Sequence, residues 1–175
     1  QPATDKLLSF TRFVNQDGSN LDLVPHSVTP LSNGDVWVTT TIGPLLLSRS
    51  AIDNPETAVF TQVKVPRNDG TNLADYLLSG IDVTCMAIGG GRKWFGTKSN
   101  GVYLISADNM TQVKHILSSN SPLLSDNILS IAINNATGEV FFGTDKGLCS
   151  YMSDATTPSD RPSKDGCFIR LSESS

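Results

Sequence analysis

One block of sequence occurs three times in this chain, and its spacing limits the fold more than any other feature does. Each copy contains an apolar segment, a turn, a second segment centred on an aromatic residue, and a third apolar segment. The aromatic positions are Trp37, Trp94 and Phe141, so successive copies lie 57 and 47 residues apart. A period of roughly 40 to 50 residues is typical of one four-stranded blade of a β-propeller. The repeat therefore predicts an all-β chain with about three antiparallel blades.

Each copy is expected to form four short strands, ordered from the inner edge of a blade outward. The expected strands are residues 26–31, 35–41, 43–49 and 59–65 in the first copy, 82–88, 92–97, 101–106 and 111–117 in the middle copy, and 128–133, 139–144 and 147–152 in the last. The central runs lack alternation of apolar and polar residues, which suits strands that neighbouring blades cover on both faces. Helical character is confined to residues 72–78, where we expect a single turn capped by Asn72.

The domain organisation follows from these blades. Residues 26–152 form the propeller blades, at about 26–65, 82–117 and 128–152. Residues 1–25 are expected to supply, at 7–13, the outer strand of a preceding blade. Residues 153–175 begin rich in Pro, Ser and Asp, and they form either a linker or, at 167–171, the closing outer strand of the last blade.

Three blades do not close a ring, since propellers typically have four to eight. We therefore expect the chain to be a fragment of a larger propeller. Such an arc leaves two blade faces open, so either the native protein continues on both sides or the open faces pair with a second copy.

Composition and charge exclude several classes of function. The net charge is −4 and the 13 Lys and Arg residues are scattered, so no basic stripe exists to neutralise the phosphates of a nucleic acid. No apolar stretch approaches the roughly 20 residues that span a bilayer, and any targeting signal is expected to lie outside this sequence. The chain is expected to bind no nucleic acid and to contain no membrane segment.

The cysteines do not indicate a metal site. Cys85, Cys149 and Cys167 are odd in number and show no C-x-x-C spacing, which disfavours both zinc and a disulfide framework. We expect Cys85 and Cys149 to be small buried apolar residues. A bridge from Cys149 to Cys167 between neighbouring strands is the alternative.

No catalytic set is evident, and we expect no enzyme, no cofactor and no metal. The only histidines, His26 and His115, fall in or beside strands of different blades, so they do not converge with a nucleophile. Glycines 89–91 precede a strand rather than a helix, which favours a hairpin turn over a phosphate loop. The Gly-Thr pairs at 96–97 and 143–144 are expected to be structural, with the glycine admitting a close neighbour and the threonine satisfying a turn.

Blade geometry indicates where a ligand would bind. In an antiparallel blade, the loop between the second and third strands and the connection to the next blade emerge at the same end. That end is expected to present Lys98, Ser99, Asn100, Asp145 and Lys146 from the loops, and Arg67, Asn68, Asp69, Asn120, Asp126 and Asn127 from the connections. These side chains are polar and of mixed sign, which suits a sugar or a protein loop.

The repeat resembles a known family. Residues 120–133, followed by Gly-Glu-Val-Phe-Phe-Gly-Thr-Asp-Lys-Gly-Leu at 138–148, are similar to the two-component-regulator propeller repeat, and the resemblance covers about residues 26–152. Leu124 stands where the family's lead-in has proline, and Phe141 stands where tryptophan is commonest. The first copy has Thr39 and Thr40 in place of the Gly-Thr pair.

The resemblance implies an extracytoplasmic module, in the periplasm or at the bacterial cell surface. Similar repeats form the periplasmic sensor regions of hybrid two-component systems, which are implicated in carbohydrate sensing and signal transduction, and propellers of PorZ-like surface proteins of the type IX secretion system. Two hypotheses follow. The chain is either a module that recognises a glycan or protein and relays this to other domains, or a docking scaffold of a PorZ-like protein.

Overall fold

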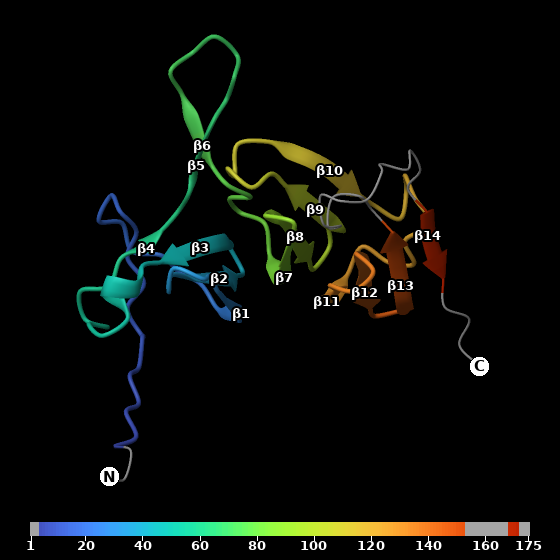
Figure 1. Ribbon diagram of the computed structural model, residues 1–175. Coiled ribbons are helices and arrows are strands. Elements are labelled where there is room, and N and C mark those ends of the chain that lie inside the picture. The colour runs from blue at the N-terminus through green and yellow to red at the C-terminus, as the bar shows by residue number, and fades with distance from the viewer. Residues whose placement is uncertain (1–3, 153–167, 172–175) are drawn as a thin grey trace.

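The structure, a computed structural model, describes residues 4–152 and 168–171. Within them, the only helical element is the short 3₁₀ helix η1 (Arg49–Ala51), and three four-stranded antiparallel sheets follow one another along the chain. Figure 1 shows these sheets arranged as blades around a common centre. The predicted all-β propeller architecture is therefore confirmed.

The strands lie close to the positions that the repeat predicts. The first blade contains β1 (Pro25–Pro30), β2 (Val36–Thr40), β3 (Gly43–Leu47) and β4 (Phe60–Thr61). The middle blade contains β7 (Val83–Gly89), β8 (Arg92–Thr97), β9 (Val102–Ile105) and β10 (Gln112–Ile116). The last blade contains β11 (Ile128–Asn134), β12 (Glu139–Thr144), β13 (Gly147–Met152) and β14 (Phe168–Leu171). In each sheet the strands pair in chain order, and β7, the first strand of the middle blade, contacts the first strands of both other blades, β1 and β11 (Figure 1).

The blades are held together by aromatic side chains that leave adjacent positions of β8 in opposite directions. Trp94 packs toward the last blade, with its ring centroid 5.7 Å from that of Phe142. Phe95 packs toward the first blade, 6.0 Å from Trp37. Successive side chains of a strand point to opposite faces, so a strand that is covered on both sides is apolar at every position. This explains why the central runs lack alternation.

The N-terminal segment covers the outer part of the free face of the first blade. Phe10 and Phe13 pack against Phe60 in a cluster that also contains Val38, and the centroids of the Phe13 and Phe60 rings lie 5.0 Å apart. The expected strand at residues 7–13 is wrong, because this segment forms no strand. Its side chains pack on the blade without pairing their backbone to it.

The fourth strand of the first blade is shorter than predicted. It ends at Thr61, and the chain continues into β5 (Lys64–Pro66) and β6 (Ala74–Tyr76), which pair with each other as a separate ribbon. Figure 1 shows this ribbon projecting outward from between the first and middle blades. The expected helical turn at 72–78 is also wrong, since β6 occupies it. The insertion accounts for the longer spacing between the first two copies.

The Gly-Thr pairs are structural, as predicted. The hydroxyl groups of Thr40, Thr97 and Thr144 each donate a hydrogen bond to the carbonyl of the glycine that opens the next strand, at 2.7 to 2.8 Å. A Cβ atom at Gly96 would lie 2.6 Å from the sulfur of Cys85, and one at Gly143 would lie 2.5 Å from the hydroxyl of Ser130. The close neighbour of each glycine is therefore a side chain of the inner strand, not a backbone.

The end of the chain contributes to the last blade. The strand expected at 167–171 is present as β14, which pairs with β13. Cys85 and Cys149 are buried free thiols, as expected, whereas Cys167 and the alternative bridge to it lie outside the described residues. No helix in the described part of the chain has the length and apolarity needed to cross a bilayer.

Burial should protect both described thiols from alkylation. It raises the pKa of Cys85, and Cys149 has no exposed surface, while the thiolate is the reactive form. We expect iodoacetamide at pH 8 to modify both at least about tenfold more slowly in the native protein than in urea, as followed by peptide mass spectrometry. Rapid modification of Cys85 in the native state would contradict this packing.

The glycine at the start of β9 should be far more sensitive to substitution than a glycine in an open turn. Gly101 has a φ of 66°, and a Cβ atom there would fall on the carbonyl oxygen of Ile116. We expect Gly101→Ala to lower the free energy of unfolding by roughly 3 kcal/mol. The matched control is Gly70→Ala, where φ is 85° but nothing lies within 4 Å, so it should cost roughly 1 kcal/mol. Urea denaturation measures both, and equal losses would refute the close contact.

Candidate functional site

The loops at one end of the propeller are anchored by a hydrogen bond that recurs in all three blades. In each blade, the first backbone amide of the loop between the second and third strands donates a hydrogen bond to a backbone carbonyl. That carbonyl belongs to the residue just before the first strand of the same blade. These bonds are Thr41 N to Val24 O at 3.1 Å, Lys98 N to Asp82 O at 3.0 Å, and Asp145 N to Asn127 O at 3.4 Å. The backbone of each loop is therefore fixed, although its side chains are free to face solvent.

Two of these loops are joined into one surface. The amide of Gly101 donates to the carbonyl of Asp126 at 3.0 Å, and the amide of Asp145 donates to the adjacent carbonyl of Asn127. The middle and last blades thus present a continuous set of polar residues, here called the loop face. It consists of Lys98, Ser99, Asn100, Asn127, Asp145 and Lys146. Five of the six are exposed and Asn127 is half-buried, and their side chains make no hydrogen bond or ion pair with the other described residues.

Two residues predicted for this site instead hold its backbone. Asn120 accepts a hydrogen bond from the amide of Leu117 at 2.9 Å and donates one to the carbonyl of His115 at 3.0 Å. Asp126 accepts from the amide of Ser118 at 2.7 Å. Their side chains are occupied within the connection, so they position the loop face rather than extend it.

Three further predicted residues lie on the projecting ribbon. Arg67 forms an ion pair with Asp75 across the ribbon at 2.9 Å, and that hydrogen-bonded partner raises the pKa of Arg67. Asp69 accepts hydrogen bonds from Thr71, which lower the pKa of Asp69. Asn68 has a φ of 55° at the tip. No contact among the described residues joins these three to the loop face.

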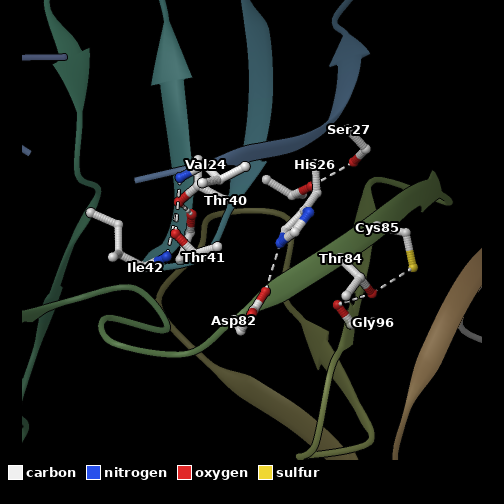
Figure 2. Close-up of polar contacts among 12 residues, drawn as sticks. Val24, His26, Ser27, Thr40, Thr41, Ile42, Asp82, Thr84, Cys85 and Gly96 are labelled. Atoms are coloured by element: carbon white, nitrogen blue, oxygen red, sulfur yellow. Dashed lines mark hydrogen bonds and ion pairs between the residues drawn. The ribbon is translucent and has the colours of Figure 1, made fainter. Parts of the chain in front are cut away.

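Sequence reasoning missed a hydrogen bond between side chains of the first and middle blades. Figure 2 shows the Nε2 atom of His26 directed at a carboxylate oxygen of Asp82, at 2.8 Å. His26 lies at the bulge of β1, and Thr84, at the matching bulge of β7, donates to the carbonyl of Ile128 in the last blade. Each bulge residue therefore reaches the next blade. No sequence signal could have found the pair of His26 with Asp82, because the bulges are visible only in the paired strands.

Both histidines have partners within the fold. The hydroxyl nearest to His26 along the chain, that of Ser27, is hydrogen-bonded to Thr39, so it is not directed at the imidazole (Figure 2). His115 stacks on Tyr103, with 4.0 Å between ring centroids, and its Nε2 atom lies 2.7 Å from the carbonyl of Asn100. His115 thus supports the loop face. Within residues 4–152 and 168–171, no three His, Cys, Asp or Glu side chains gather as a metal site would require.

The loop face offers hydrogen bonds and charges of both signs. Two ammonium groups, one carboxylate, two amides and one hydroxyl stand on a backbone that is already ordered. Such a surface can bind hydroxyl-rich or mixed-charge ligands without a further loss of backbone entropy. It lacks the concentrated charge that a polyanion would require.

Comparison with known proteins gives structural neighbours only. No protein-family model and no curated protein matches the sequence. The structure of PorZ, an essential bacterial surface component of the type IX secretion system of Porphyromonas gingivalis, aligns with 87% of this chain at a TM-score of 0.76 and 27% identity, covering 20% of PorZ. The extracellular domain of the hybrid two-component system BT3049 from B. thetaiotaomicron aligns with 89% of it at a TM-score of 0.54 and 18% identity, covering 19% of that chain.

The likeness to BT3049 concerns the fold alone, whereas the likeness to PorZ extends to the sequence. The chain spans about a fifth of the length of each. These structural neighbours match the two-component-regulator propeller family that the repeated sequence resembles.

Proposed function

We propose that this chain is a non-enzymatic binding module of an extracytoplasmic protein, and that its loop face recognises a glycan or a protein partner. One observation carries the proposal. The backbone of the loop face is held by hydrogen bonds, whereas its side chains make none with the other described residues. A preordered surface of this kind loses little conformational entropy when it binds. Recognition would then be relayed to parts of the protein outside the described residues.

The location of the module is inferred from its neighbours. PorZ is described as a surface component and the BT3049 segment as an extracellular domain. Both support an extracytoplasmic position, in the periplasm or at the cell surface.

A second function, that of a docking scaffold in a PorZ-like surface protein, is favoured by the stronger of the two likenesses. The alignment with PorZ has both the higher identity and the higher TM-score. In this case the loop face would contact another protein of a surface assembly instead of a soluble ligand. The two functions differ in ligand class but use the same surface.

Paired alanine substitutions test the loop face. We expect Asn100→Ala with Asn127→Ala to weaken binding by roughly tenfold, because each amide loses its hydrogen bonds to the ligand. The measurement is a glycan array, followed by titration of any glycan that binds and by affinity capture from cell-envelope extract. Light scattering beforehand establishes whether open blade faces pair two copies.

The matched control is Asn135→Ala, an exposed asparagine in the turn at the other end of the last blade. A glycan that binds the control normally and the double variant weakly supports recognition of a sugar. Capture of one surface protein with the same dependence supports the scaffold. Binding that the double variant leaves unchanged would exclude the loop face as the site.

A further inference from the structure

One peptide group of the loop face is fixed by hydrogen bonds at both of its polar ends. This peptide joins Asn100 to Gly101, in the loop between β8 and β9. Its carbonyl oxygen, that of Asn100, lies 2.7 Å from the Nε2 atom of His115. Its amide, that of Gly101, donates to the carbonyl of Asp126 at 3.0 Å. Because a peptide group is planar, bonds at both ends fix its orientation.

The imidazole of His115 is itself held in place. It stacks on the ring of Tyr103 in the neighbouring strand β9, with 13° between the ring planes and 4.0 Å between the centroids. A carbonyl oxygen only accepts hydrogen bonds, so the Nε2 atom carries the proton that His115 donates to Asn100. The side-chain amide of Asn120 donates to the backbone carbonyl of His115 at 3.0 Å. Both the ring and the backbone of His115 therefore have partners that hold the donor in position.

The middle blade differs from the first in how this loop carbonyl is bound. The equivalent residue of the first blade is Ile42, since it also precedes the glycine whose carbonyl accepts from the threonine hydroxyl. The carbonyl of Ile42 accepts from a backbone amide, that of Gly80, at 3.0 Å. A backbone amide is present whatever side chain a residue carries, whereas the donor of His115 belongs to its side chain. One side chain thus controls how the loop that carries Asn100 is held.

Asn100 is the member of the loop face that this peptide orients. Its side chain is exposed and makes no hydrogen bond with the described residues, while its backbone amide donates to the hydroxyl of Thr97 at 2.8 Å. With both its amide and its carbonyl bonded, Asn100 has a fixed backbone, so the direction in which its side chain leaves the loop is also fixed. A group that is already oriented loses less entropy when it binds.

We infer that His115 is a positioning residue for the loop face, and that it strengthens ligand binding through Asn100 rather than by touching the ligand. Without the donor, the peptide between Asn100 and Gly101 is free to turn, and the Asn100 side chain takes several directions. Binding then weakens although every side chain of the loop face is still present. His115 acts here on the surface whose function is proposed above, so this role rests on that proposal.

Two substitutions separate the hydrogen bond of His115 from its bulk. His115→Phe keeps a ring that can stack on Tyr103 but lacks the donor, whereas His115→Gln carries an amide donor about as far from the backbone as Nε2. Hydrogen exchange of the whole 175-residue chain, followed by NMR, reports on the loop without any ligand. We expect the amide of Gly101 to exchange at least roughly tenfold faster in His115→Phe, and within about threefold of the unaltered rate in His115→Gln. The matched control is the amide of Lys98 in the same loop, which donates to Asp82 at 3.0 Å and should keep its rate.

A binding measurement tests whether His115 acts through Asn100. The probes are methyl β-D-glucopyranoside, which is rich in hydroxyl groups, and N-acetylglycine N-methylamide, which carries the amide groups of a protein backbone. NMR titration compares the unaltered protein, His115→Phe, Asn100→Ala and the double variant. We expect His115→Phe to weaken binding of at least one probe by roughly threefold or more, and to have no further effect once Asn100 is alanine. A residue that only stabilised the fold would weaken binding by the same factor in both backgrounds.

The results distinguish a wrong role for His115 from a wrong function for the loop face. Unchanged exchange at Gly101 in His115→Phe would overturn the inference, and so would equal acceleration at Lys98, which would indicate a general loss of stability. Equal weakening of probe binding by His115→Phe with and without the Asn100 side chain would overturn it as well. If exchange behaves as expected but neither probe shifts the signals of Asn100, that result counts against the proposed function, whereas the positioning of Asn100 by His115 holds.

Discussion

The packing of aromatic side chains on both faces of the second strand is the constraint on which the rest of the structure depends. Trp94 and Phe95 are adjacent in sequence, and neither has any exposed surface. One packs with the last blade and the other with the first, so a single dipeptide joins three sheets. Burial of rings this large dominates the stability of a β structure, and it also sets the angle at which the blades present their loops.

Each blade repeats a small polar frame around this apolar contact. A threonine closes the loop after the second strand, a glycine leaves room for the inner strand, and in the first two blades a bulge residue reaches the next blade. In the first blade the glycine is replaced by Thr39, which bonds with the hydroxyl of Ser27 at 2.5 Å. The loop face follows from the frame, because its backbone is held by the repeated bonds and its side chains are not.

Sequence reasoning predicted the three sheets well because a blade is a local structure, in which each strand pairs with the next along the chain. It was wrong where pairing is decided by distant parts of the chain. Residues 7–13 have the composition of a strand, but their side chains pack on the apolar face of the first blade, and the backbone first pairs with that blade at Val14. Likewise, the expected helical turn at 72–78 is replaced by β6 at 74–76, because residues 64–66 pair with it in the ribbon.

The candidate site was predicted in part, for a related reason. Polarity and position identify residues at a loop end, but they do not show which side chains are already hydrogen-bonded. The side-chain amide of Asn100 makes no hydrogen bond with the described residues, whereas that of Asn120 bonds to the backbone of Leu117 and His115. The pair of His26 with Asp82 spans 56 residues, and no local pattern links two such positions.

The two outer faces of the arc, one on the first blade and one on the last, differ in how far their apolar side chains are covered. Phe10 and Phe13 cover much of the free side of the first blade, while the free side of the last blade carries Phe141, which is half-buried, and Leu129, which is 57% exposed. Head-to-tail stacking of copies joins unlike faces and can continue without limit. Head-to-tail stacking of this chain would have to displace the N-terminal segment from the first blade. Two copies that meet through their last blades would instead bury the same face of each copy and form a closed dimer. Among the described residues, the two ends of the arc therefore offer unlike surfaces to a neighbouring sheet, one covered by phenylalanine rings and the other with an exposed leucine.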